Sequence, residues 1–164
     1  MKIAIDIDGV VVDLVESWLR KFHPDHVKED MYSWSGFDGV GSTVEEFFEE
    51  ICELTVNDII MIKDASETIK RIREKHDVFF LTDKHSGVMG WTVGVLKKYG
   101  LGNIEFINCK VEDKQKEEYN YDVLIDDCPL RIDDGRLYMF DQPWNRSIYF
   151  NNRVFGWLDF ESKI

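Results

Sequence analysis

The sequence predicts an α/β fold in which helices cover a parallel sheet, and three observations predict it. Apolar segments typical of strands alternate along the chain with segments of helical periodicity. The 164 residues suffice for one domain, and they contain no repeat, low-complexity tract or Pro/Ser-rich linker. An apolar fraction of 44% and an aromatic fraction of 13% can form a buried core. We therefore expect residues 1–164 to fold as a single domain.

Five segments are predicted as strands of this sheet. The first alternates and is rich in isoleucine, whereas the second is an almost continuous apolar run, which is typical of a strand buried on both faces. The five segments span residues 2–7, 76–82, 104–107, 121–125 and 137–141. Residues 147–160 are amphipathic and fit either a helix or a strand.

Four segments are predicted as helices from apolar residues at helical spacing and from signals at their ends. They span residues 13–22, 42–54, 64–75 and 87–99. Capping boxes of Ser42 with Glu45 and of Asp64 with Glu67 begin the second and third helices. Residues 14–62 form a long helical excursion between the first two strands, and we expect them to lie as a small cap above the sheet.

The charge balance excludes several classes of partner. The chain has 20 Lys and Arg against 32 Asp and Glu, a formal charge of −12, which disfavours binding to polynucleotides or to anionic membranes. No apolar run reaches the ~18–20 residues of a membrane span, and early acids argue against a signal peptide. Three cysteines, Cys52, Cys109 and Cys128, without a Cys-x-x-Cys motif indicate reduced thiols and a cytoplasmic protein.

Acidic and hydroxyl side chains lie where three of the predicted strands end. Asp6 and Asp8 belong to the first strand end, Thr82 to the second, and Asp126 and Asp127 to the fourth. Because the carboxyl ends of parallel strands meet at one edge of a sheet, we expect these side chains to lie close together. Gathering four carboxylates is costly unless a cation neutralises them. Oxygen ligands without His or Cys favour Mg²⁺, which often also binds a substrate phosphate.

Each of these features also has a purely structural interpretation. Asp8 and Gly9 fit the two-residue turn of a β-hairpin, since apolar alternating segments flank them. Thr82 fits a cap after a strand, and the paired aspartates fit the N-cap of a helix. Their joint order along the chain, each at a strand end, favours a site over these separate interpretations.

Four features of the sequence together resemble the motifs of the haloacid dehalogenase superfamily of phosphotransferases. They are the segment Asp6–Val10 (DIDGV), Thr82 after a buried strand, a downstream lysine and the paired aspartates. More narrowly, the segments DVLIDDCP (122–129) and DQPWNR (141–146) resemble the 5′(3′)-deoxyribonucleotidase family. The resemblance covers nearly the whole chain. It implies a Rossmann-like three-layer α/β core with a small helical cap inserted after the first strand.

The resemblance also implies a role for each residue at the strand ends. Asp6 is implied as the nucleophile that forms an aspartyl-phosphate, Asp8 as the general acid and base, and Thr82 as the hydroxyl that holds the phosphoryl oxygens. A Mg²⁺ ion is implied on the Asp6 carboxylate, the Asp8 carbonyl and preferably Asp127. Asp126 then contacts the ion through water or supports its ligands.

A lysine that neutralises the phosphoryl charge is implied as well, and three candidates precede the paired aspartates. They are Lys110, Lys114 and Lys116, of which Lys116 has the spacing most similar to the family pattern and Lys114 comes second. Asp83 follows Thr82 where the family commonly has a small hydroxyl residue, and it adds negative charge near the phosphate. We therefore expect Thr82, Asp83 and Lys116 to contact the substrate.

The expected activity is Mg²⁺-dependent hydrolysis of small nucleoside monophosphates, preferably deoxyribonucleotides. Trp34 and Phe37 are candidates for stacking on the base, and ordinary core packing is the alternative for both. Trp144 and Arg146 either close the site or anchor the C-terminal segment. A phosphatase for another small phosphate ester and a non-catalytic interaction protein of the same fold are the rival functions.

Overall fold

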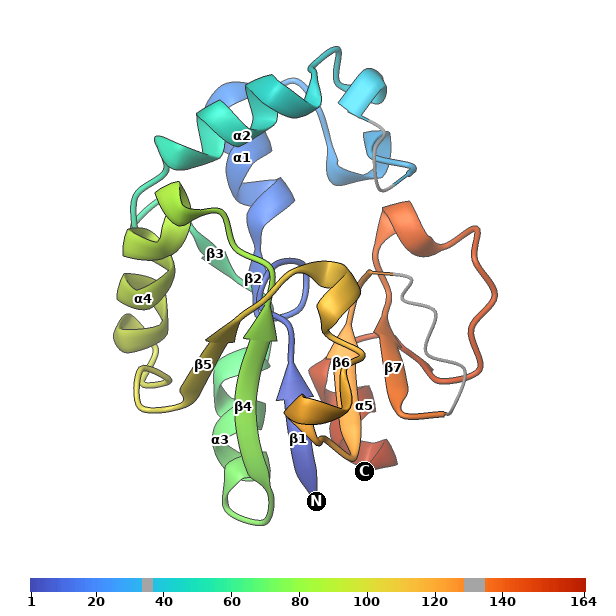
Figure 1. The fold of residues 1–164 in the computed structure, drawn as a ribbon. Helices are drawn as coiled ribbons and strands as arrows, with labels where there is room; N and C mark the ends of the chain where they lie inside the picture. Colours follow the sequence, from blue (N-terminus) through green and yellow to red (C-terminus); the bar gives the residue numbers. More distant parts are fainter. Residues whose placement is uncertain (34–36, 129–134) are drawn as a thin grey trace.

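A six-stranded parallel sheet forms the centre of the molecule, in the order β5-β4-β1-β6-β7-β8 (Figure 1). The structure is a computed structural model that describes residues 1–33, 37–128 and 135–164. The predicted α/β fold with a parallel sheet is confirmed. The strands are β1 (Lys2–Ile5), β4 (Asp77–Thr82), β5 (Glu105–Asn108), β6 (Val123–Asp126), β7 (Leu137–Phe140) and β8 (Arg153–Val154).

The position of β1 places a ligand site at its carboxyl end. β1 lies between β4 and β6, so the chain builds the sheet first toward one edge and then toward the other. Such a switch point leaves a crevice beyond the carboxyl ends of the strands, where ligands of open α/β sheets bind. Asp6 stands immediately after β1, at this point.

Alternate side chains of β1 enter two different apolar clusters. Ile3 and Ile5 join the larger cluster, which includes residues of the flanking helices, whereas Ala4 joins the smaller one. In Figure 1, α3 and α5 lie behind the sheet, and the segment that carries the 3₁₀ helices η4 and η5 lies in front. The elements behind the sheet are α3 (Ala65–Arg73) and α5 (Trp157–Lys163), and those in front are η4 (Val111–Asp113) and η5 (Glu117–Tyr119). A further helix, α4 (Met89–Lys98), lies between β4 and β5 in the chain.

Residues 14–62, which we call the cap segment, lie over the carboxyl ends of the strands (Figure 1). Their main helices pack through aromatic rings, since Trp18 meets Phe47 edge to face with ring centroids 5.0 Å apart. The cap segment contains α1 (Leu14–Phe22), η1 (Lys28–Asp30), η2 (Phe37–Gly39) and α2 (Val44–Cys52). A short antiparallel pair, β2 (Val12–Asp13) and β3 (Ile60–Met61), joins it to the rest of the chain. None of the described helices combines the length and apolarity needed to cross a bilayer.

Two helix starts and one ambiguous segment differ from the sequence prediction. The capping box of α2 is Thr43 with Glu46, one residue later than predicted, and a sequence with hydroxyls and glutamates at both offsets permits either. Asp64 precedes α3 with a left-handed backbone, φ 64°, and makes no side-chain cap. Residues 147–160 contain both β8 and the start of α5.

Candidate active site

A tight loop after β1 carries the first two predicted acids. The backbone N–H of Asp6 donates to Ile125 O at 2.9 Å, which keeps the end of β1 against β6. Ile7 O accepts from the N–H groups of Val11 and Val12, so the chain turns back within a few residues. The hairpin alternative is therefore wrong, because β2 pairs with β3, which lies far along the sequence, and not with β1.

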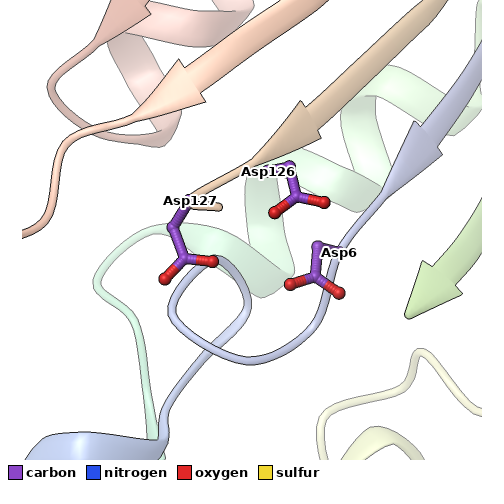
Figure 2. Close-up of side chains that lie close together, drawn as sticks. All are labelled: Asp6, Asp126 and Asp127. Atoms are coloured by element: carbon purple, nitrogen blue, oxygen red, sulfur yellow. The ribbon is translucent and has the colours of Figure 1, made fainter. Parts of the chain in front are cut away.

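Three buried aspartates converge at the carboxyl edge of the sheet (Figure 2). Carboxylate oxygens of Asp6, Asp126 and Asp127 lie within 4.8 Å of one another. The parallel pairing of β1 with β6 brings them together, because Asp6 follows one strand and Asp126 ends the other. Asp8 is predicted to bind the metal ion through its backbone carbonyl, and its carboxylate lies outside this group and pairs with Lys84.

One buried lysine lies against this acid group. Lys114 Nζ is 3.0 Å from Asp6 Oδ1 and 2.7 Å from Asp126 Oδ2. Its side chain is almost completely buried, so the two ion pairs are shielded from solvent. Lys114 therefore occupies the place that the resemblance assigns to the phosphate-binding lysine.

Lys116, the lysine predicted from spacing, does not reach the acid group. Its side chain is 53% exposed and pairs with Asp113 at 3.1 Å. Lys114 caps the end of η4 and Lys116 caps the start of η5, and the turn between these helices leaves one lysine inside and the other outside. The structure corrects the prediction from Lys116 to Lys114, and Lys110 is exposed.

Burial dominates the electrostatics of the acid group. It raises the pKa of Asp126 to about 6, although Lys114 opposes the shift. Burial, together with the charges of Asp126 and Asp6, raises the pKa of Asp127 well above its ordinary value. Burial disfavours the Lys114 ammonium, but Asp126 and Asp6 outweigh this effect and raise the pKa of Lys114. Three carboxylates thus share one ammonium, and a further cation would favour their ionised forms.

The hydrogen bonds of the paired aspartates distinguish their roles. Both oxygens of Asp126 are engaged, Oδ2 by Lys114 Nζ and Oδ1 by the N–H of Cys128 at 2.8 Å. Asp127 Oδ2 accepts from Trp144 Nε1 at 2.9 Å, whereas its buried Oδ1 has no partner among the described residues. The donor set therefore fits a hard divalent cation on Asp127 and Asp6, with Asp126 held by the protein.

The segment after β7 fixes Asp127 and the loop after β1. Asn145 Nδ2 donates to the Asp127 carbonyl at 2.8 Å, and Gln142 Nε2 donates to the Gly9 carbonyl at 2.5 Å. Trp144, between them, donates to the Asp127 carboxylate and lines the cavity above it. Trp144 thus joins the site, which resolves one of the open alternatives.

Replacing Gly9 by alanine is expected to damage both stability and the site. Gly9 has φ +74°, and an added Cβ would lie 2.2 Å from Asp127 Oδ2. We expect Gly9→Ala to lower the free energy of unfolding by about 1–3 kcal/mol and to displace Asp127. Urea denaturation measures the first effect, and an assay of the phosphatase activity that the resemblance implies measures the second.

Gly41→Ala is the matched control, because Gly41 has φ +73° and, apart from its chain neighbours, no atom of the described residues lies within 4 Å of an added Cβ. We expect it to be destabilised by backbone strain while activity is retained. Equal activity in the two variants would show that a side chain at position 9 does not disturb the Asp127 carboxylate.

A cavity of about 710 Å³ lies between the acid group and the cap segment. Asp6, Asp8 and Asp127 line it from the sheet, and apolar side chains of α1 and α2 line it from the cap segment. Phe37 also lines the cavity, and its ring packs on Phe47 with centroids 4.6 Å apart, so it belongs to the aromatic core and to the cavity wall. Trp34, the other stacking candidate, lies outside the described residues.

Thr82 ends β4 and Asp83 follows it, and of these two residues Asp83 lines the cavity whereas Thr82 does not. The Thr82 hydroxyl is buried, and its Oγ1 has no hydrogen-bond partner among the described residues. Asp83 lines the cavity, but its Oδ2 accepts from the N–H of Val111 at 3.0 Å. Asp83 therefore anchors η4, the turn that carries Lys114.

Sequence reasoning gave no role to Lys84 or to Gln142 and Asn145. The Lys84 side chain is completely buried and pairs with Asp8. In the sequence, Lys84 is marked only by its place directly after Asp83, where the chain departs from the family pattern that follows Thr82. The polar pair around Trp144 lies in the DQPWNR segment, whose resemblance marked the region but not its contacts. Arg146, in the same segment, pairs with Asp141 at 3.0 Å.

Comparison with known proteins identifies the family of the chain. The whole chain, residues 1–164, matches the model of one family, described as 5′ nucleotidase, deoxy (pyrimidine), cytosolic type C protein. A haloacid dehalogenase-like hydrolase from Burkholderia xenovorans LB400 shares the fold, with a TM-score of 0.56 and 12% identity over 98% of this chain and 94% of that one. No curated protein sequence matches the chain. The chain therefore belongs to this 5′-nucleotidase family and is a phosphoric monoester hydrolase.

Proposed function

We propose that the protein is a Mg²⁺-dependent phosphatase that hydrolyses small nucleoside monophosphates, preferably deoxyribonucleotides, through an aspartyl-phosphate on Asp6. One observation carries the proposal: Asp6 lies beside Lys114 and the incompletely bonded Asp127 at the base of a cavity with an apolar upper wall. A nucleophile, a cation site and space for an organic leaving group are thus adjacent. The cytosolic type in the family description and three free cysteines support a cytoplasmic location.

The proposed reaction has two halves. In the first, the Asp6 carboxylate attacks phosphorus while Asp8 donates a proton to the departing nucleoside oxygen. In the second, water attacks the phosphorus, its proton passes to Asp8, and Asp6 is released with inorganic phosphate.

Two further residues would support the phosphoryl group during both halves. Lys114 neutralises charge on the Asp6 carboxylate and the phosphoryl oxygens, and the Thr82 hydroxyl donates to one of those oxygens. Asp6, Asp127 and the Asp8 carbonyl would hold a Mg²⁺ ion, which when bound would supply positive charge near the phosphoryl oxygens.

The cavity supports a nucleoside as the leaving group. Its volume of about 710 Å³ lies within the ~300–1,000 Å³ of ordinary small-molecule sites. Phe37, Phe47 and Phe48 line its cap side, and aromatic faces of this kind suit a planar base better than a strongly hydrated sugar phosphate.

An assay of phosphate release with Mg²⁺ tests the substrate class. We expect deoxyuridine and deoxythymidine monophosphates to be hydrolysed with a higher kcat/KM than sugar phosphates or glycerol phosphate. Isomers with a 3′ or a 5′ phosphate, and their ribose counterparts, then define the preference. Higher kcat/KM for a sugar phosphate would support the rival phosphatase, and no turnover of any ester would support a non-catalytic protein.

Removing the indole donor to Asp127 is expected to weaken Mg²⁺ activation. Trp144→Phe keeps an aromatic ring but loses the hydrogen bond to Asp127 Oδ2. Partners that orient metal ligands typically contribute about 10–100-fold in affinity, so we expect the Mg²⁺ concentration for half-maximal activity to rise about tenfold. Trp157→Phe is the matched control, because the same substitution there removes an indole hydrogen bond to the Val10 carbonyl and not to Asp127. Equal Mg²⁺ dependence in both variants would argue against Asp127 as a ligand.

Mg²⁺ is expected to stabilise the protein more at about pH 7.5 than at about pH 5. The pKa of Asp126 is raised to about 6 in the fold, and that of Asp127 is raised too. A raised carboxyl pKa means that the metal-free fold binds extra protons, so it loses stability as pH rises from about 4 through 6. Mg²⁺ offsets the ionised charge above that range and competes with protons below it. Thermal unfolding with and without Mg²⁺ measures the difference, and an equal shift of Tm at both pH values would contradict it.

A further inference from the structure

The Asp8 carboxylate has an ion-pair partner of its own. Lys84 Nζ pairs with Asp8 Oδ1, and the Lys84 side chain is 0% exposed whereas that of Asp8 is 25% exposed. Asp8 lines the cavity, and its Oδ2 accepts no hydrogen bond from the residues that the structure describes. The protein therefore fixes one carboxylate oxygen and leaves the other available to a ligand or water in the cavity.

Lys84 is itself held at both ends. Its backbone N–H donates to Asn108 Oδ1 at 2.8 Å, and its carbonyl accepts from Asn108 Nδ2 at 3.1 Å. Its Nζ lies 4.6 Å from the centre of the Trp91 ring, a favourable cation–π distance. Trp91 in turn donates from Nε1 to Ile51 O in the last turn of α2, at 3.1 Å. The ammonium thus has little freedom to leave Asp8 for the substrate.

This placement assigns Lys84 a different task from Lys114. Lys114 lies beside Asp6, where the phosphoryl group would be transferred. Lys84 also borders the cavity, but its ammonium is held between the Asp8 carboxylate and the Trp91 ring. Resting on the proposed function, we propose that Lys84 is a positioning residue for Asp8. Its ammonium holds Oδ1 so that Oδ2 accepts the proton of the water that attacks the aspartyl-phosphate.

In the second half of the reaction the phosphoryl group passes from Asp6 to water. The water oxygen forms a bond to phosphorus while the bond from phosphorus to the Asp6 oxygen breaks, and that electron pair returns to the Asp6 carboxylate. The water proton moves to Asp8 Oδ2, and inorganic phosphate leaves. Asp8 must present Oδ2 to the water at this moment, and an ammonium fixed on Oδ1 favours that orientation.

4-Nitrophenyl phosphate separates this step from the first half, because its phenolate leaves without needing a proton. With this ester and Mg²⁺, kcat/KM reports formation of the aspartyl-phosphate, and kcat also includes its hydrolysis. We expect Lys84→Met to lower kcat about tenfold or more and KM by the same factor, with kcat/KM changed by less than about twofold. Stopped-flow records should show a burst of about one nitrophenolate per enzyme before slow turnover.

Three further variants keep the test decisive if Lys84→Met folds poorly. Lys84→Arg retains the charge and is expected to restore part of kcat. Asn108→Ala releases the Lys84 backbone and should lower kcat and KM together by about threefold, as expected for lost hydrogen bonds. Lys97→Met, at an exposed position of α4, should match the unaltered protein.

Two outcomes would overturn the proposal. A higher KM at unchanged kcat in Lys84→Met would make Lys84 a substrate-binding residue. Parallel losses in kcat and kcat/KM without a burst, in Lys84→Met and in Asn108→Ala, would indicate general damage to the site. Failure of the proposed function is distinguishable. A non-catalytic protein would hydrolyse neither 4-nitrophenyl phosphate nor a nucleoside monophosphate, and a phosphatase for another ester would hydrolyse only the first, in which case the Lys84 comparison still applies.

Discussion

Asp6→Asn is expected to abolish phosphatase activity, with a loss in kcat on the order of 10⁴-fold or more, while the fold is retained. An amide of the same shape cannot form the aspartyl-phosphate. The substitution also removes one of three buried negative charges that share Lys114, so the thermal unfolding temperature should stay the same or rise. Steady-state kinetics and calorimetry on the same preparation measure the two effects.

The combination of lost activity and retained stability distinguishes a residue that takes part in the reaction from one that only supports the fold. Asp25→Asn is a matched control, because Asp25 is exposed in the cap segment, and its activity should stay within about twofold. An Asp6→Asn variant that kept more than about a tenth of the activity would remove Asp6 from the role of nucleophile.

Lys114→Met is expected to have the second largest effect. Lys114 is the ammonium in contact with both Asp6 and Asp126, so its loss leaves buried carboxylates without a counter-charge. We expect kcat/KM to fall on the order of 10³-fold and the free energy of unfolding to fall by about 3–5 kcal/mol. Mg²⁺ should recover part of the stability but not the activity, because the ion does not replace the charge between Asp6 and Asp126.

Lys116→Met provides the contrast, since Lys116 is half exposed and pairs with Asp113 alone among the described acids. Its activity and stability should stay close to those of the unaltered protein, because exposed ion pairs contribute ~0–1 kcal/mol. A severe loss of activity in Lys116→Met with a mild one in Lys114→Met would restore the assignment made from sequence spacing.

The sheet and the acid group could be predicted because hydrophobic patterning defines both. Buried strands must be apolar, so their ends are visible where the first polar residues appear, as at Asp6, Thr82 and Asp126. Once the strands are parallel, their carboxyl ends have to meet at one edge. The meeting of Asp6 with the paired aspartates therefore needed no knowledge of side-chain conformations.

The choice of lysine could not be made in the same way. Lys114 and Lys116 lie in a segment of 3₁₀ turns without the regular periodicity that reveals an inward face. Contacts with the distant Asp6 and Asp126 decide which lysine is buried. Sequence spacing alone could therefore limit the phosphate-binding lysine to a few candidates but could not choose among them.

The ion pair of Lys84 with Asp8 and the support of Asp127 by Trp144 also arise from tertiary structure. Each joins residues far apart in the chain, and neither lies on a periodic element that would mark the contact. The first residue of α2 could not be predicted from the sequence either. Two adjacent hydroxyl–glutamate pairs fit a capping box equally well, and the structure selects Thr43 with Glu46.

Transfer of the phosphoryl group through Asp6 would leave an aspartyl-phosphate that can be detected directly. The protein would be mixed with Mg²⁺ and 4-nitrophenyl phosphate, quenched in acid within the first turnover, digested and examined by mass spectrometry. An Asp8→Asn variant, whose second half-reaction should be slow, would be treated in parallel. We predict one added phosphoryl group on the peptide that contains Asp6, and none in Asp6→Asn. Turnover with no phosphoryl group on Asp6 in either protein, or with one on another residue, would contradict the account.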